Sequence, residues 1–428
     1  MPALTELSDE ALIDRLQRGA FTYFIDYTQA HTGLVADNSR AGSPCSIAVV
    51  GFALSCYPVG VERGWMSRTQ AAALTLRTLR FFWSSIQGDQ ANVTGYRGFY
   101  YHFLGMQTGR RVWQCELSLI DTALLMAGIL TAGAYFDGAG EEADIRRLSD
   151  ALYRRVDWQW AQNGQRTVSQ GWKPECGFLN YGWEGYNEAA LLYVLGIGSP
   201  THALAAGSFT GWTCTYQWEN LLGHDVLYSG PLFTHLFSHA WIDYRNIQDA
   251  FMREKHSDYF DNTRSAIAIQ REYGARNPHG FEGYDRDLWG VTAGDGPGNR
   301  ELRQHGRDRR FFGYMSRGVP YGPDDGTIAP WAMLATLPFD ADAALRGTRH
   351  LLRTYPEVCT QDRFSSGFNP TVESPSGGWL SEGWFGLDQG LLVMMIENYR
   401  SGLIWDITRR CPAIRAGLIG AGFTGGWL

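Results

Sequence analysis

Apolar residues recur at helical spacing in many segments of this 428-residue chain, and no strong series of alternating strand residues accompanies them. This pattern predicts an all-α fold. Short and long connections alternate between the predicted helices, as in a ring of helical hairpins. The helix candidates cover residues 8–29, 44–57, 67–86, 116–136, 140–160, 185–197, 231–256, 257–275, 327–337, 340–354, 386–400 and 402–410.

The long connections are rich in Gly, Trp, Tyr, Asp and Asn, and long loops inside a domain are usually functional. In a toroid of helical hairpins, an (α/α) barrel, such loops gather on one face and form a cleft there. No linker, low-complexity tract or block of charge divides the chain, so residues 1–428 are predicted to form a single domain. The long loops cover residues 87–113, 162–184, 276–326 and 355–385.

Composition restricts the partners. The net charge of −7 argues against nucleic acid and gives no basic anchor for an anionic membrane surface. Aromatic residues make up 14% of the chain, including 16 Trp and 21 Tyr. Because these side chains combine a flat apolar face with a polar group, their excess in Gly-rich loops favours an oligo- or polysaccharide substrate over core packing alone.

The chain as written carries no secretory signal. Its first 27 residues form an amphipathic helical pattern without a basic n-region, an apolar h-region or a small-residue cleavage site. A cytoplasmic location is therefore expected, or a periplasmic or secreted one if a leader has been trimmed. The seven cysteines are scattered and include no CxxC pair, so neither a zinc ribbon nor a redox motif is indicated.

Two groups of acidic residues precede strongly apolar helices. Glu116 and Asp121 stand at the start of one such segment, where they either cap the helix or present a carboxylate to a cleft. Glu188 precedes a second segment that is apolar all round, so its carboxylate must be solvated, paired or catalytic. Apolar shielding would raise the pKa of Glu188, as a general acid requires.

Further side chains are candidates for binding a sugar. Trp183, Tyr186 and Asn187 stand beside Glu188, and His239 belongs to a polar helical segment with His235 four residues before it. That histidine spacing alone is common, so hydrogen bonding in a cleft is favoured over a metal site, and no metal is predicted. The later loops alternate tryptophan with aspartate and contribute Trp289, Asp295, Asp325, Trp384 and Asp388.

Several of these segments resemble, in order along the chain, the glucoamylase-like domain family. This family includes the endo-β-1,2-glucanases of glycoside hydrolase family 144 and a region of the cyclic β-1,2-glucan synthases. The resemblance runs from about residue 12 to residue 423. The segments that carry it are residues 98–130, 171–202, 228–254, 288–298, 324–330 and 386–405.

The resemblance implies an (α/α)6 barrel and hydrolysis of β-1,2-linked glucose with anomeric inversion. The glutamate of the family's WEGYNEA-like motif matches Glu188, and the acid before Thr-Ala on an inner helix matches Asp121. Many family members read Asp-Leu-Val-Glu at that place, where this chain has Ser-Leu-Ile-Asp beginning at Ser118. Glu116 is therefore kept as an alternative base.

The resulting hypothesis is general acid–base glycoside hydrolysis without a cofactor. Glu188 would protonate the leaving oxygen, and Asp121 or Glu116 would activate water on the opposite face of the sugar. Three alternatives remain open. The cleft could transfer or cyclise β-1,2-glucan chains, it could bind glycans without catalysis, or the chain could be a helical scaffold without a ligand.

Overall fold

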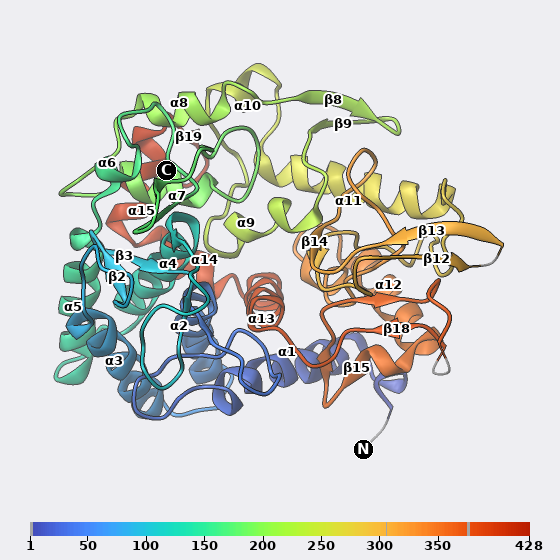
Figure 1. The fold of residues 1–428 in the computed structure, drawn as a ribbon, viewed down its shortest axis with the longest axis horizontal. Helices are drawn as coiled ribbons and strands as arrows, with labels where there is room; N and C mark the ends of the chain where they lie inside the picture. The colour runs from blue at the N-terminus through green and yellow to red at the C-terminus, as the bar shows by residue number, and fades with distance from the viewer. Residues whose placement is uncertain (1–2, 305, 375–376) are drawn as a thin grey trace.

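The computed structural model describes residues 3–304, 306–374 and 377–428, and most of its regular structure is helical (Figure 1). Among these residues, no helix combines the length and the hydropathy that crossing a bilayer requires. The helices are α1 Asp9–Asp26, α2 Ile47–Glu62, α3 Arg68–Ser84, α4 Leu119–Tyr135, α5 Glu141–Arg155, α6 Trp158–Ala161, α7 Ala190–Ile197, α8 Gly207–Thr213, α9 Phe237–Trp241, α10 Ala250–Glu254, α11 Tyr259–Arg276, α12 Ala341–Thr354, α13 Gly386–Arg400, α14 Leu403–Arg409 and α15 Pro412–Gly420.

Two kinds of helix are present. Helices α2, α4, α7 and α13 are buried over nearly their whole length, whereas α1, α3, α5 and α12 bury one face. In α1, Ser8 accepts a hydrogen bond from the backbone of Ala11, and Leu12, Leu16 and Phe24 lie on the buried face. Helix α2 packs against α4 and α13, and α13 packs against α1, which brings the end of the chain back to its beginning.

Glycines allow α2 and α4 to cross at close range. A Cβ atom added at Gly128 would lie 2.0 Å from the carbonyl oxygen of Gly51, and one added at Gly51 would lie 2.3 Å from that of Leu124. Neither site has room for a side chain. The backbones of these two buried helices are therefore in direct contact at the crossing.

Short strands occupy the loops. An antiparallel five-stranded sheet has the order β2 Gly95–Tyr96, β3 Phe99–Tyr101, β5 Leu117–Ser118, β6 Gly171–Lys173 and β7 Gly177–Phe178. The remaining strands pair two by two, as β1 Cys45–Ser46 with β4 Phe103–Leu104, β8 Trp218–Leu221 with β9 His224–Leu227, β10 Ile247–Gln248 with β19 Thr424–Gly425, β11 Ala293–Gly294 with β14 Met315–Ser316, β12 Arg300–Gln304 with β13 Arg307–Phe311, β15 Cys359–Thr360 with β16 Arg363–Phe364, and β17 Phe368–Asn369 with β18 Trp379–Leu380.

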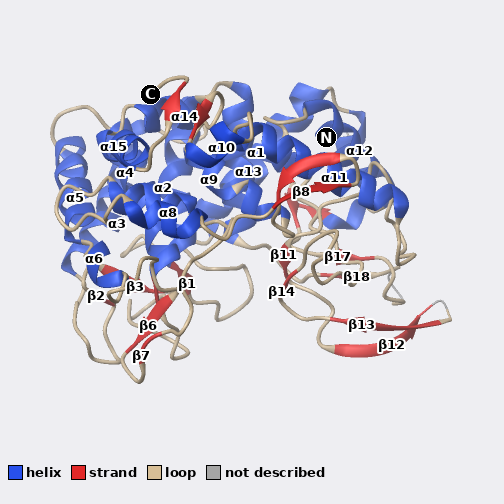
Figure 2. Ribbon diagram, turned by 90° about the horizontal axis from the view of Figure 1, so that it is seen from above, coloured by secondary structure: helices blue, strands red, loops and turns tan. Residues whose placement is uncertain are grey.

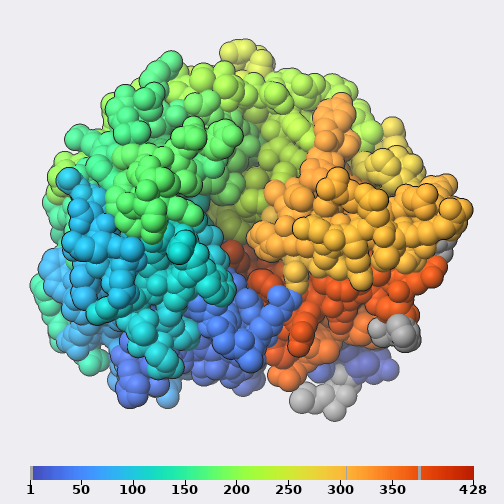
Figure 3. Space-filling model, in the orientation of Figure 1, coloured from blue at the N-terminus to red at the C-terminus, as the bar shows by residue number. Residues whose placement is uncertain are grey.

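Most of these strands and long loops lie on one side of the helices (Figure 2). The same face is hollowed near its middle, between residues from the N-terminal, central and C-terminal parts of the chain (Figure 3). The fold is thus mostly helical, as predicted, but the all-α prediction missed the small sheets that build this face.

The prediction of one continuous helix over residues 231–256 is wrong. The Asp243 side chain accepts a hydrogen bond from the backbone of Arg245, and Asn246 adopts a left-handed φ of 62°, so the chain leaves the helix. The prediction over residues 327–337 is also wrong. Pro330 disfavours a helical conformation at the residue before it, and only a 3₁₀ turn, Leu334–Thr336, forms there.

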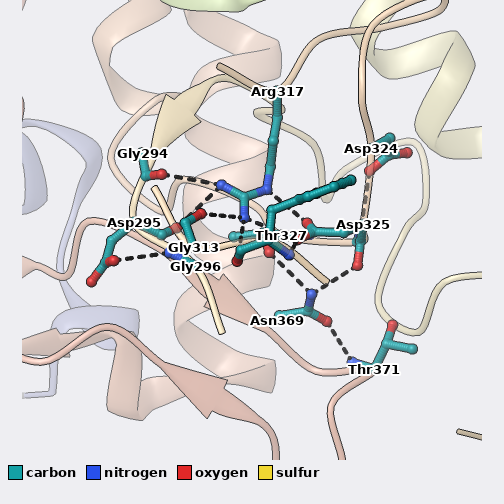
Figure 4. Close-up of polar contacts among 12 residues, drawn as sticks. Gly294, Asp295, Gly296, Gly313, Arg317, Asp324, Asp325, Thr327, Asn369 and Thr371 are labelled. Carbon is teal, nitrogen blue, oxygen red and sulfur yellow. Dashed lines mark hydrogen bonds and ion pairs between the residues drawn. The ribbon is translucent and has the colours of Figure 1, made fainter. Parts of the chain in front are cut away.

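A buried ion pair joins the loops on the right of Figure 1. Arg317 and Asp325 are both fully buried, and the Arg317 guanidinium donates to the two Asp325 carboxylate oxygens over 2.7 and 2.9 Å. Arg317 also donates to the carbonyls of Gly294 and Gly313, while Asn369 donates to the carbonyl of Asp325 (Figure 4). One residue pair thus fixes strands β11, β14 and β17 relative to one another.

Substitution of Arg317 by Met is expected to lower the free energy of unfolding by about 3–5 kcal/mol, because Asp325 would stay buried without its partner. Urea denaturation measures this loss. Arg303→Met is the matched control: its side chain is 72% exposed beside Asp308, so its loss should stay below about 1 kcal/mol. Equal losses in the two variants would contradict the role given to Arg317.

Candidate functional site

A cavity of about 310 Å³ opens in the hollowed face. Its wall combines carboxylates with aromatic and aliphatic side chains, a composition suited to a polar ligand with flat apolar faces. The three residues predicted to be catalytic, Glu116, Asp121 and Glu188, all line it. So do Trp183 and Asp388, which were predicted to bind substrate.

The acids reach the cavity from the beginnings of buried helices. Asp121 is the third residue of α4, where the Ser118 hydroxyl caps the helix by accepting from the Asp121 backbone over 3.1 Å and donates to its carboxylate over 2.5 Å. Asp388 is the third residue of α13. Glu188 stands two residues before α7. Since these helices have no polar face, a carboxylate can meet solvent only at their ends.

His102 joins two of the acids. Its Nδ1 lies 2.8 Å from Glu116 Oε1, and its Nε2 lies 3.5 Å from Asp121 Oδ2. Burial alone would lower the pKa of His102, but the charges of Asp121 and Glu116 raise it to about 9. Burial likewise opposes ionisation of Glu116, yet the hydrogen bond and charge of His102 hold its pKa below the usual value. His102 and Glu116 therefore form an ionised cluster, and the Asp121 carboxyl lies beside its imidazolium.

Ligand atoms of His102, Glu116 and Asp121 lie within 4.8 Å of one another, a spacing at which three such groups can hold a metal ion. His102 instead forms a direct hydrogen bond with Glu116, and its pKa is raised. These two observations favour a protonated imidazole between Glu116 and Asp121 over a metal ion. The absence of a metal stays a prediction.

Glu188 has a different electrostatic environment. Burial, together with the charge of Asp121, raises its pKa to about 7. Burial also raises the pKa of Asp388 well above its ordinary value, and Asp388 Oδ2 has no hydrogen-bond partner among the described residues. The cavity thus pairs carboxyl groups that favour the protonated form with an ionised cluster, as general acid–base chemistry requires.

Tyr314 is a cavity residue that the sequence did not reveal. It lies between β13 and β14, and the residue is 68% exposed at the cavity wall. Partial desolvation within the hollow raises the pKa of Tyr314, and the charges of Asp388, Asp37, Asp121 and Glu188 raise it further. No local motif marks this tyrosine, because only the folded loop brings it to the acids.

Asn187 and Tyr186, two predicted binding residues next to Glu188 in the sequence, do not line the cavity. Asn187 Oδ1 accepts hydrogen bonds from Trp212 Nε1 over 3.2 Å and from the backbone of Ala189 over 3.0 Å, which fixes the turn that carries Glu188. Tyr186 packs at 5.1 Å from the ring of His235 and does not line the cavity. Both residues therefore position the site instead of contacting a ligand in the cavity.

Three other predicted binding residues are corrected by their burial. His239 is buried beside Thr263, where desolvation lowers its pKa to about 3. Trp289 is buried in the core, and Asp325 belongs to the ion pair with Arg317. Each had been inferred from a polar or Gly-rich sequence context, and none lines the cavity.

Asp295 and Trp384 lie in the loops near the cavity without lining it. Asp295 forms an ion pair with Arg40 and accepts a hydrogen bond from Ser381 over 2.8 Å. The guanidinium of Arg363 lies 4.9 Å from the centre of the Trp384 ring. Both side chains are thus engaged within the protein.

The His102 imidazole is expected to titrate near pH 9, which an NMR pH titration measures directly. Glu116→Gln should lower that midpoint, because one of the two stabilising carboxylates is lost, whereas Glu184→Gln on the exposed loop should not. Since the folded-state pKa lies above the ordinary 6.5, protonated His102 stabilises the fold below pH 6.5, and this contribution disappears as the pH rises through about 9. A midpoint near 6.5 would contradict the ionised cluster.

Known proteins with similar sequences share this architecture. A curated relative from Parabacteroides distasonis, named as an exo beta-1,2-glucooligosaccharide sophorohydrolase acting at the non-reducing end, is 26% identical over 450 residues. The match covers 96% of this chain and 58% of the relative, so the chain spans somewhat more than half the length of that protein.

Solved structures agree over almost the whole chain. The endo-beta-1,2-glucanase of Chitinophaga pinensis, in complex with sophorotriose and glucose, has a TM-score of 0.84 and 25% identity, covering 99% of this chain and 100% of the other. An endo-beta-1,2-glucanase of Talaromyces funiculosus in complex with sophorose has the same fold with a TM-score of 0.66 at 10% identity, covering 96% and 90%.

A family model matches as well. The model described as Glycoamylase covers residues 180–412, which is more than half of the chain and includes Glu188 and Asp388. This chain therefore belongs to the glycoamylase family.

Proposed function

We propose that this chain is a glycoside hydrolase that cleaves β-1,2-glucan or its oligosaccharides by carboxylate acid–base catalysis. One observation carries the proposal: Glu188, whose pKa is raised to about 7, lines the same aromatic-walled cavity as Asp121 and as Glu116, whose pKa is lowered. Paired carboxyl groups with divergent pKa values are the usual machinery of glycoside hydrolysis.

In this mechanism Glu188 protonates the oxygen of the leaving sugar, directly or through a substrate hydroxyl. Asp121 accepts a proton from the attacking water on the other side of the ring. Asp121 is preferred to Glu116 as the base, because the charge of Asp121 contributes to the raised pKa of Glu188 and therefore acts on the proposed acid directly. The imidazolium of His102 lies beside Asp121 and would fix the direction of its carboxylate.

The cavity wall suits a sugar ring. Trp183 and Tyr314 offer aromatic faces, and Ser118 and Asp388, which are largely buried where they line the cavity, offer hydrogen-bonding groups. Burial favours a protonated Asp388, which would donate a hydrogen bond to a sugar hydroxyl. No step of this mechanism needs a cofactor.

The β-1,2 linkage rests on the relatives. The similar proteins from Parabacteroides distasonis and Chitinophaga pinensis are named for action on β-1,2-linked glucose chains. The same acids would also serve transfer of a glucan chain to another sugar. Chromatography of the products separates the two reactions, because transfer gives longer or cyclic products.

The scaffold we infer is a single-domain (α/α)6 barrel. Buried helices α2, α4, α7 and α13 would form part of the inner ring, and the amphipathic α1, α3, α5 and α12 part of the outer one. Contact of α13 with α2 and α1 supports closure of the ring. One continuous hydrophobic cluster extending from Leu12 to Phe423 supports a single domain.

Glu188→Gln is expected to reduce hydrolysis of linear β-1,2-glucan by roughly 10²–10⁴-fold, because the amide cannot donate the acid's proton. Reducing-end release from β-1,2-, β-1,3-, β-1,4- and α-1,4-glucans measures both activity and linkage. Glu184→Gln, an exposed neighbour on the same loop, is the control and should retain activity. Wild-type activity in Glu188→Gln would reject this residue as the acid.

The pH dependence should report Glu188. Since the reaction needs the protonated acid, kcat/KM should fall as the pH rises through about 7, the pKa to which burial raises Glu188. The charge of Asp121 contributes to that shift, so Asp121→Asn should move the titration of Glu188 to lower pH, as followed by ¹³C NMR of its side-chain carboxyl. A descending limb unrelated to that titration would contradict the assignment.

A further inference from the structure

A second groove of about 730 Å³ lies beside the catalytic cavity. Its walls come from residues 26–44 and 105–113. Several of the groups that line it are uncharged amides and hydroxyls, which match the hydroxyls of a saccharide, and they stand beside apolar surface that includes Met106, Val112 and Trp113. The polar groups include Thr28, Gln29, Asn38, Ser43, Gln107 and Thr108.

Trp113 lies in the wall of this groove with an exposed indole. Its side chain is 70% exposed, although a single exposed aromatic residue is common on protein surfaces. The backbone conformation of Trp113 distinguishes it from other exposed aromatic residues. Trp113 and Gln114 both adopt left-handed φ values, 58° and 52°, which cost free energy for residues other than glycine.

The turn that carries Trp113 is held firmly on both sides. Arg111 donates to the carbonyl of Cys115 over 2.6 Å and to both carboxylate oxygens of Glu175 over 2.6 and 3.0 Å. The backbone of Val112 donates to Phe103, and the backbone of Phe103 donates to the Cys115 sulfur. The tryptophan is therefore displayed by a fixed turn instead of lying on a loose loop.

Side-chain stacking connects the groove with the catalytic cluster. The ring of Trp113 lies 5.2 Å from that of Phe103, which stacks on His102 at 3.9 Å and 12°. The wall built by residues 26–44 also approaches the catalytic cluster. Arg40 lines the groove and pairs with Asp295, while the nearby Asp37 helps to raise the pKa of His102.

We propose that Trp113 and this groove form a distal subsite that binds glucose units of the substrate beyond those held in the catalytic cavity. The inference rests on the proposed function and adds a chain-length preference to it. The apolar face of a glucose ring would stack on the indole, and its hydroxyls would bond to the groove's amides. The only guanidinium among the groove's lining residues, that of Arg40, is already paired with Asp295, which leaves an anionic ligand without a partner.

The test compares kcat/KM for long and short linear β-1,2-glucooligosaccharides. Trp113→Ala should lower the long-to-short ratio roughly tenfold, equivalent to the loss of one stacking contact. Trp113→Tyr keeps an aromatic face and should restore most of the ratio. Trp83→Ala is the matched control, because Trp83 is a 44% exposed tryptophan on α3 outside the groove.

Two failures are distinguishable. If the wild-type protein cleaves β-1,2-glucan and the ratio is the same in Trp113→Ala, the distal subsite is overturned while the proposed function stands. If the wild-type protein neither cleaves β-1,2-glucan nor binds it in isothermal titration, both are overturned. A lower ratio in Trp113→Ala that Trp113→Tyr does not restore assigns Trp113 a structural role and also overturns the subsite.

Discussion

Helices without a polar face determine where chemistry can occur in this molecule. Because α2, α4, α7 and α13 are enclosed by other elements along nearly their whole length, an ionisable side chain can reach solvent only at their ends. Asp121 and Asp388 hold the same third position in α4 and α13, and Glu188 stands two residues before α7. The packing of the scaffold thus concentrates carboxyl groups around one cavity, where burial raises the pKa of Glu188 and Asp388 while His102 lowers that of Glu116.

The opposite wall of the cavity is organised by a different interaction. The guanidinium of Arg317 gathers backbone carbonyls from two loops, and its carboxylate partner Asp325 receives the backbone N–H of Phe312. Tyr314 belongs to this ordered segment, so its place among the acids depends on an ion pair that takes no part in the cavity itself. A charged pair whose residues are both inaccessible to solvent serves here as a positioning device.

Much of the site could be predicted from the sequence. An acid at the start of an apolar helix is a local pattern, and it identified Glu116, Asp121 and Glu188 as residues of the cavity. Trp183 was inferred from its place beside Glu188, and Asp388 from the alternation of tryptophan and aspartate in the later loops. Sequence patterns failed where long-range contacts determine the role of a residue. Asp325 and Trp289 lie in Gly-rich segments like those of binding loops. Their contacts, however, come from segments distant in the sequence, which no local pattern includes.

The prediction of secondary structure failed for the same reason. Helical spacing located α1, α3, α5, α11 and α13 well, since an apolar stripe is sufficient to define each of them. Residues 231–256 carry apolar residues at helical spacing too, but hydrogen bonds made by Asp243 and the pairing of β10 with β19 interrupt the helix. The five-stranded sheet escaped prediction because its strands are only two or three residues long, too short for an alternating pattern.

The glycine crossing between α2 and α4 has a consequence for the reaction centre. With backbone touching backbone at Gly51 and Gly128, the axis of α4 cannot move toward α2, and any added methyl group would push it away. Asp121 lies in the first turn of α4, so a shift of this helix would also move the Asp121 carboxylate relative to His102. The absence of a side chain at Gly51 and Gly128 hence helps to set the position of the proposed base.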